Sequence, residues 1–298
     1  MYKTLFLSLL TATLLVACSS DDAEEPQLLE EPRLLTVEVM ENTLIDTNGA
    51  PMQAPTRTAA AITTGTLTEF YMNYQKNAYT FTKTDGTWNT TYSWPTLNPE
   101  DGLDFYAYNY KDEEEGDRFY WNNDNDPYIS YVMSDNDAFN QTDLLVAKHE
   151  DISYNDAGGK VSLTFDHACA AVKFNISKTS GVGNKQIDVT SVQLSGVKNK
   201  GEYHYNNTPN TPHWEYLSGS ASYKLTTAKN ITLTTEKTAL PCGYLFLIPQ
   251  TKVGLTLTVE YTVEGVEGTQ SHDFELTGTW EAGIEYVVNI NMGTSIIK

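Results

Sequence analysis

Residues 255–264 read LTLTVEYTVE and carry the clearest structural signal in the chain. The odd-numbered positions hold leucine, valine or tyrosine and the even-numbered positions hold threonine or glutamate, until Gly265 ends the run. Successive side chains of a β-strand point to opposite faces of the sheet, so this alternation predicts a strand with one buried and one solvated face.

Shorter runs of this kind fill most of the chain after Leu34, and no window keeps a helical period for three turns. Clusters of glycine, proline, asparagine and aspartate, such as Asp85-Gly86, separate the runs. Short strands at regular spacing predict an all-β fold made of antiparallel sandwiches. The runs cover residues 34–39, 67–74, 103–108, 128–133, 143–147, 161–165, 172–176, 189–194, 244–248 and 286–290.

The apolar positions change parity between residues 161–165, where they are odd, and residues 168–176, where they are even. This change predicts a bulge or bend near Asp166-His167. The turn at 155–159 just before it is the best linker candidate. We therefore predict two β-sandwich domains in tandem, at residues 34–157 and 158–298, each with about seven strands.

The N-terminus has the layout of a secretory signal at residues 1–17: a start with Lys3, an apolar run and small residues before Cys18. Leu15-Val16-Ala17-Cys18 matches a lipobox, so we expect Cys18 to carry a lipid that tethers the chain. The alternatives are a plain secretory signal or a short membrane anchor, but about 11 apolar residues are too few to span a bilayer that needs about 20. Residues 18–33 are acidic and predict a flexible tether.

The formal net charge is −20, and removing the signal with its one lysine makes it −21. This charge argues against nucleic acid and against anionic lipid as partners. We therefore expect contact with a membrane only through the lipid on Cys18.

Two further thiols, Cys169 and Cys242, would face an oxidising compartment after export. One disulfide between them is a possible arrangement, and two separately buried thiols are the other. We favour the separate thiols, because the spacing does not show that their Cα atoms approach each other.

The five histidines are scattered, and the chain lacks the paired motifs of zinc sites, nucleophile elbows and phosphate loops. We expect no catalytic residue, no metal and no cofactor, and we classify the protein as a non-enzyme. A hydrolase that uses two carboxylates is the enzymatic alternative, since such a pair needs no sequence motif. Calcium in the oxygen-rich stretches 112–117 and 122–127 is a weaker alternative, because Pro127 stands where a calcium loop needs glycine.

Aromatic residues could form a sugar-stacking platform if they reach the surface, but large rings more often fill a core. We favour the core for the set Trp88, Trp94, Phe119, Tyr120, Trp121 and Trp214.

Several segments, in order, resemble the fimbrillin family, the lipoprotein subunits of type V pili of the Bacteroides group. They are Tyr92 to Pro95 with Leu103 to Tyr108, Asp143 to Ala147, Leu163 to Ala168, Leu247 to Gln250, and Trp280 to Tyr286. The acidic residues behind Cys18 also resemble a signal for the outer face of the outer membrane. The resemblance implies an outer membrane lipoprotein at the cell surface or in the fimbrium.

The resemblance further implies transthyretin-like sandwiches and a structural pilus subunit whose partners are neighbouring subunits. In such pili an Arg-specific protease removes the first strand, and a donor strand of a neighbour fills the groove. Leu35, Val37 and Val39 alternate with Thr36, Glu38 and Met40, as a removable strand should. Arg57 is our candidate for the cleaved residue, and Arg33 is the second candidate.

After the last predicted strand, Thr294 to Lys298 are short for a donor strand. A subunit that accepts a strand but donates one poorly would sit at an end of the fibre. We therefore favour a tip or anchor role over a shaft role. The alternative function is a monomeric surface lipoprotein that binds a glycan or a host protein, and a host or bacterial surface ligand is compatible with either function.

Overall fold

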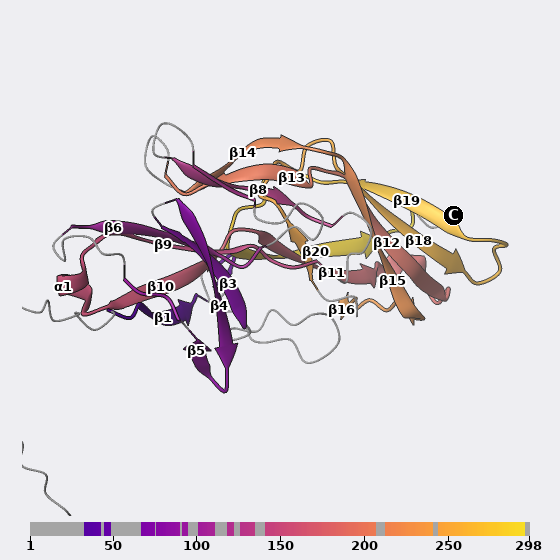
Figure 1. Cartoon of the computed structure of the whole chain (residues 1–298). Helices are drawn as coiled ribbons and strands as arrows, with labels where there is room; N and C mark the ends of the chain where they lie inside the picture. Colours follow the sequence, from indigo (N-terminus) through magenta and orange to yellow (C-terminus); the bar gives the residue numbers. More distant parts are fainter. Residues whose placement is uncertain are drawn as a thin grey trace, which may run out of the picture.

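Strands form nearly all of the regular structure in the computed structural model, which describes residues 33–42, 45–48, 67–74, 76–89, 91–94, 101–110, 118–121, 126–134, 141–206, 212–240 and 244–295. In these ranges the helical segments are α1 (Tyr154–Ala157) and one 3-10 turn (Ser180–Val182). No helix of the described ranges is long and apolar enough to cross a membrane. The all-β prediction is confirmed (Figure 1).

The first sheet has seven strands and takes most of its residues from the chain before His167. The pair formed by β1 (Thr36–Glu41) and β10 (Lys160–His167) is parallel, and the other neighbouring strands of this sheet are antiparallel. Asp85 and Gly86 have left-handed backbone angles in a tight hairpin, as the sequence predicts for a turn there. The order is β1 (Thr36–Glu41), β10 (Lys160–His167), β9 (Leu145–Ile152), β6 (Leu103–Tyr108), β3 (Glu69–Tyr74), β4 (Asn77–Thr84) and β5 (Thr87–Asn89).

This sheet curls around one core. The rings of Phe70 in β3 and Phe165 in β10 lie 5.4 Å apart between centroids, although β6 and β9 separate the two strands in the sheet. Both rings are fully buried. The residues that surround them, here called the first core, include Leu35, Phe81, Trp94, Phe105, Val161 and Leu163.

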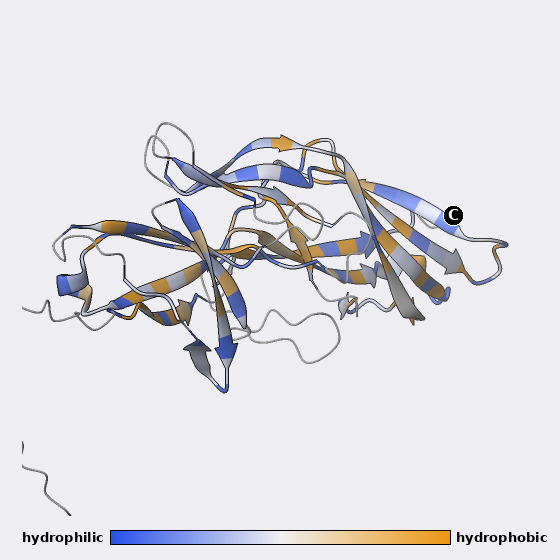
Figure 2. Ribbon diagram, viewed as in Figure 1, coloured by the Kyte–Doolittle hydropathy of each residue, from blue (hydrophilic) through white to orange (hydrophobic). Residues whose placement is uncertain are grey.

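Two further sheets share a second core, which holds the fully buried Trp280. The strand predicted from LTLTVEYTVE is β18 (Thr256–Val263), and its odd-numbered residues are buried. Figure 2 colours the strands by the hydropathy of each residue. One sheet has the order β16 (Thr238–Ala239), β11 (Ala170–Lys178), β20 (Ile284–Met292) and β2 (Ile45–Asp46), with β17 (Leu245–Leu247) also on β11. The other has the order β15 (Ala221–Thr232), β12 (Ile187–Val197), β18 (Thr256–Val263) and β19 (Gln270–Glu275).

A four-stranded sheet covers the second face of β6 and β9 through a third core rich in tyrosine. Tyr205 donates a hydrogen bond from its hydroxyl to the carbonyl of Ala107 in β6, at 2.7 Å. In Figure 1 this sheet lies above the first sheet and above the two sheets that share the second core. Its order is β14 (His213–Ser218), β13 (Lys200–His204), β8 (Pro127–Val132) and β7 (Phe119–Trp121).

The strands do not follow the division that the sequence suggested at residues 157–158. β9 and β10 lie on the two sides of this point and are neighbours in one sheet, and the four-stranded sheet takes two strands from each side. The parity change near Asp166-His167 instead marks the passage of the chain from the first sheet to the next, where β10 ends and β11 begins. The antiparallel expectation fails for three strand pairs of the described ranges: β1 with β10, β11 with β20, and β2 with β20.

Removing the ring of Phe165 tests the curled first core. Phe165→Ala should lower the free energy of unfolding by about 3–5 kcal/mol, because the cavity lies where β3 and β10 pack against each other across the first core. Thr164→Ala, which alters the opposite face of the same strand, should change it by less than about 1 kcal/mol. Urea unfolding followed by tryptophan fluorescence measures both, and equal effects would contradict the packing described.

Candidate functional site

β1 is the edge strand of the first sheet, and among the described strands it pairs only with β10. The register is parallel and regular, from Thr36 opposite Lys160 to Glu41 opposite Phe165. Because the two segments are more than 120 residues apart, nothing in the connection between them forces this pairing. The contacts of β1 itself must hold it in place.

The side chains of β1 alternate as the sequence predicts. Leu35 just before it is fully buried, and Val37 and Val39 are partly buried against the first core. Glu38 and Met40 are exposed on the opposite face. Glu38 makes an ion pair with Lys160 at 2.7 Å, but such an exposed pair contributes little to stability. The strand is therefore held by its backbone and by three apolar side chains.

The first end of β1 is fixed by backbone hydrogen bonds to residues 92–94 and 159. The amide of Leu35 donates to the carbonyl of Tyr92 at 2.9 Å, and the carbonyl of Arg33 accepts from the amide of Trp94 at 2.6 Å. The guanidinium of Arg33 lies over the ring of Tyr154, 5.1 Å from its centroid. Arg33 thus belongs to the contacts that hold the first end of β1 in place.

The other end of β1 contacts the segment in which the chain passes from β10 in the first sheet to β11 in the next sheet. The amide of Asn42 donates to the carbonyl of Phe165 at 2.8 Å, and its side chain donates to Asp166 at 2.6 Å. The Nε2 atom of His167 lies 2.9 Å from the carbonyl oxygen of Asn42. The end of β1 is therefore in direct contact with the residue at which β10 ends.

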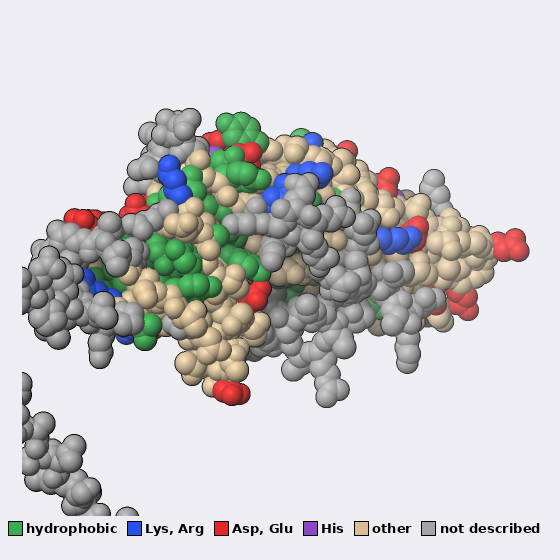
Figure 3. Space-filling model, in the orientation of Figure 1, with side chains coloured by type: hydrophobic (Ala, Val, Ile, Leu, Met, Phe, Trp, Pro, Cys, Tyr) green, Lys and Arg blue, Asp and Glu red, His purple; other side chains and the backbone are tan. Residues whose placement is uncertain are grey.

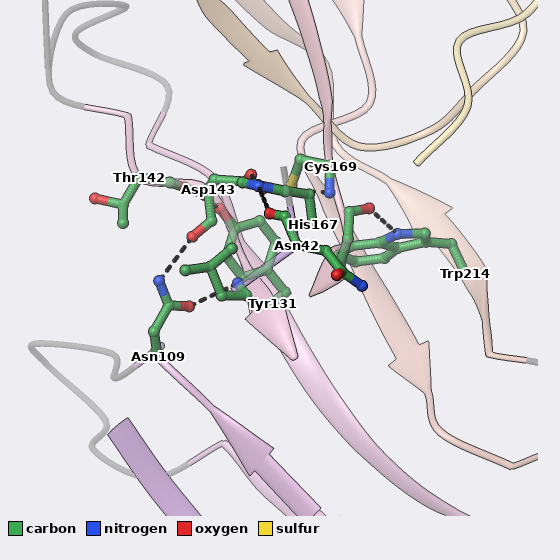
Figure 4. A network of polar contacts seen from close by, with 10 residues as sticks. Asn42, Asn109, Tyr131, Thr142, Asp143, His167, Cys169 and Trp214 are labelled. Carbon is green, nitrogen blue, oxygen red and sulfur yellow. Dashed lines mark hydrogen bonds and ion pairs between the residues drawn. The ribbon is translucent and has the colours of Figure 1, made fainter. Parts of the chain in front are cut away.

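His167 belongs to a buried polar network (Figure 4). Its Nδ1 contacts Asp143, whose other carboxylate oxygen accepts from the amide of Cys169 at 3.3 Å. Asn109 donates to the carbonyl of Asp143 at 3.0 Å and accepts from the amide of Leu145 at 2.8 Å. Residues next to the ends of β6, β9 and β11 thus meet at this pair.

Both ring nitrogens of His167 face acceptors. A neutral imidazole has only one N–H, so it cannot donate to a carboxylate and to the Asn42 carbonyl together. Both contacts are satisfied if the ring is protonated, or if Asp143 carries the proton and donates to Nδ1. Either way, the pair holds two protons when β1 is fully hydrogen-bonded.

The pKa shifts agree with this proton count. Burial of the His167 ring acts to lower its pKa, but the hydrogen bond and charge of Asp143 and the Asn42 carbonyl outweigh it, so the pKa lies above its usual value. Burial raises the pKa of Asp143, because the hydrogen bonds from His167 and Cys169 offset only part of the lost hydration. Both shifts favour the pair with two protons.

The sequence candidates fall partly outside the described residues. Cys18, Arg57 and Cys242 lie outside them, as do residues 112–117 and 122–125. Cys169 is a buried free thiol. Within the described ranges, no three His, Cys, Asp or Glu side chains are placed to hold a metal ion.

The aromatic candidates are mostly in the interior. Trp94 and Phe119 are buried, and Trp88, Trp121 and Trp214 pack against the cores. Trp214 also donates from its Nε1 to the carbonyl of Ala168 at 2.7 Å. Tyr120 differs, since its side chain is 40% exposed.

Sequence reasoning missed the pairing of histidines with aspartates. Asp143 and His167 stand inside two of the segments that carry the family resemblance, at polar positions next to apolar runs. That position could have marked them as buried polar residues. The second pair, His204 with Asp126 at 2.6 Å, has no comparable signal, because Asp126 follows a polar loop.

Comparison with known proteins gives a consistent result. The family model described as fimbrillin-like matches residues 52–298. A fimbrial protein from Bacteroides vulgatus is 19% identical, with a TM-score of 0.52, over 75% of this chain and 87% of its own. A candidate cell adhesion protein from Bacteroides ovatus is 14% identical, with a TM-score of 0.52, over 88% and 93%. At these identities the two structures show a shared fold, and no curated protein is significantly similar in sequence.

Alkaline pH should weaken the contacts that hold the end of β1 at His167. Because the pKa of His167 is raised in the folded state, its contribution to stability is complete below about pH 6.5 and is lost as pH rises through the raised value. We expect the free energy of unfolding to fall as pH rises above about 6.5, because the pair then gives up one of the two protons that its hydrogen bonds need.

Chemical unfolding at a series of pH values measures this slope. In His167→Gln the slope should be largely absent over the same range. A wild-type profile that is flat, or a variant with the wild-type slope, would contradict the role of His167.

Proposed function

The chain belongs to the fimbrillin-like family, and from this premise we propose that it is a structural subunit of a fimbrium whose N-terminal strand β1 is exchanged for a strand of a neighbouring subunit. The observation that carries the proposal is the place of β1 at the edge of the first sheet, with one strand neighbour among those described. The role is structural and needs no catalytic residue.

Loss of β1 would create an acceptor site. The backbone of β10 would lose its partner from residue 160 to 165, and the surface covered by Leu35, Val37 and Val39 would open to water. Unpaired strand edges bind extended chains readily, and apolar pockets select those with matching alternation. An incoming strand that runs parallel to β10 with apolar residues at every second position would restore both sets of contacts.

The two candidate cleavage points have different consequences. A cut after Arg57 separates β1 and β2 from the rest of the chain, whereas a cut after Arg33 removes only the tether and leaves both strands attached. The carbonyl of Arg33, which belongs to the bond to be cut, accepts a hydrogen bond from Trp94. Proteases cleave segments that can leave the fold and enter the active site of the protease, which argues against Arg33.

A cut after Arg57 would act on two sheets. β2 pairs in parallel with the start of β20, with Ile45 opposite Ile284, while β1 pairs with β10. One cleavage would therefore free an edge in each of two sheets that surround different cores. A donor strand of sufficient length could take both places.

The lipid on Cys18 would deliver the subunit to the outer membrane before assembly. If Arg57 is cut, the lipid leaves with the N-terminal segment and serves as a transient tether. If Arg57 is not cut, Cys18 is a permanent anchor at the cell surface. A place at the tip or base of the fibre remains part of the proposal, and gold labelling of fibres locates the subunit.

Replacing the lipidated cysteine tests the tether. Cys18→Ala should abolish incorporation of labelled palmitate and move the protein out of the outer membrane fraction, because the lipid on Cys18 is the proposed tether. Cys242→Ala is the matched control and should keep the label. Full labelling of Cys18→Ala would show that the lipid is attached elsewhere.

Arg-specific proteolysis of the folded protein tests the processing point. We expect wild-type protein to give a large fragment that begins at Thr58, identified by mass spectrometry. Arg57→Ala should resist this cut and form no fibres, because β1 stays in its seat, whereas Arg33→Ala should be cut and assemble as the wild type does.

Electron microscopy of cells that express each variant measures assembly. Normal fibres from Arg57→Ala would overturn the processing step. A large fragment that begins at Leu34 in the wild type would move the cleavage to Arg33 and leave β1 in place.

A further inference from the structure

The outer face of the four-stranded sheet carries a row of planar side chains. Tyr120, Tyr128, His204 and His213 come from β7, β8, β13 and β14, and each is directly opposite the next across the strands. Their rings are stacked, with centroids 5.2, 5.1 and 5.7 Å apart. Asp126 fixes the orientation of His204 through its Nδ1 at 2.6 Å. The row is a rigid platform across the sheet.

Tyr216 lies beside this platform, with an unusual backbone conformation and an exposed ring. Its backbone φ is +50°, which a bulky residue rarely adopts, and its side chain is 71% exposed. The register between β13 and β14 shifts here, so Tyr216 and Leu217 lie opposite Gly201. A Cβ at Gly201 would lie 2.7 Å from the side chain of Leu217, so the glycine makes room for Leu217 beneath the sheet. The bulge thereby turns an aromatic ring toward water.

Two carboxylates face each other next to this ring. Glu202 and Glu215 are directly opposite on β13 and β14, an arrangement that like charges disfavour. His204 approaches Glu202 at 3.4 Å, and His213 approaches Glu215 at 2.9 Å. The hydrogen bond from His213 lowers the pKa of Glu215, so this carboxylate is ionised at neutral pH. Figure 3 shows apolar, acidic and histidine side chains together over β14 at the top of the molecule.

We propose that this face, formed by Tyr216, Glu202 and Glu215 beside the platform, binds a cationic segment of a partner protein, with an arginine side chain as its anchor. A guanidinium can stack on the Tyr216 ring and donate to carboxylates at the same time, and it relieves the repulsion of Glu202 and Glu215. The chain charge of −20 favours the approach of a cationic partner over an anionic one.

Fluorescence anisotropy at 150 mM salt tests the site with three labelled peptides that are identical except for four positions. These positions hold arginine, lysine or the neutral isostere citrulline. The arginine peptide should bind best, the lysine peptide several-fold more weakly and the citrulline peptide not at all, since stacking and paired hydrogen bonds need the charged planar group.

Tyr216→Ala, Glu202→Gln and Glu215→Gln should each weaken binding of the arginine peptide by about tenfold. Tyr216→Phe keeps the ring and should bind nearly as the wild type does. Glu267→Gln is the matched charge control, because it removes one exposed carboxylate from the turn between β18 and β19. It should leave binding unchanged.

Equal weakening in Glu267→Gln would show attraction by net charge alone and overturn the site. Unchanged peptide binding in the Tyr216 and glutamate variants would also overturn it. If Tyr216→Ala instead loses binding to a neutral oligosaccharide panel, the face binds sugars and the cationic partner is wrong. These readouts do not depend on strand exchange, because fibre assembly of the same variants is scored separately.

Discussion

The edge of β10 that faces β1 is the constraint on which the rest of the structure depends. This strand carries Leu163 and Phe165 into the first core and presents an unpaired row of backbone groups on its outer side unless another strand covers it. Buried or apolar edges of this kind must be paired, because water cannot satisfy them and foreign strands can. β1 satisfies that need from the far end of the chain, so its contacts complete the first core.

The crossing at residues 167–169 carries this constraint into the rest of the molecule. The chain leaves one sheet here, so its backbone groups lose their ladder partners and find others. The amide of Ala168 donates to Leu144, its carbonyl accepts from Trp214, and the carbonyl of Cys169 accepts from the amide of Gly283 at 3.0 Å. Three sheets are thus joined by hydrogen bonds at one point. The end of β1 lies at the same point, because His167 contacts the carbonyl of Asn42, so β1 is coupled to the place where the three sheets meet.

Much of the fold could be predicted from local pattern. The alternation at 255–264 gives β18 with its buried face, and the parity change near Asp166-His167 locates the passage between sheets. The division at 157–158 does not match the sheets, because a Gly-rich turn can end a domain or join two neighbouring strands equally well. In the candidate site, the alternation of Leu35, Val37 and Val39 along the sequence predicted the buried face of β1. The parallel partner of β1 could not be predicted in this way, nor could the contacts of Asn42 and His167 that hold its end.

The sequence by itself determined that this chain is all-β, which residues are buried in strands with a clear alternation such as β18, and that it resembles the fimbrillin family. These properties depend on neighbours two residues apart or on short segments, and both can be read along the chain. Only the tertiary structure decided that β1 pairs with β10, that β7 and β8 join β13 and β14, and that His167 and His204 each find an aspartate. Such pairings join residues that are distant along the chain through backbone groups that are the same in every strand, so no local pattern specifies the partner.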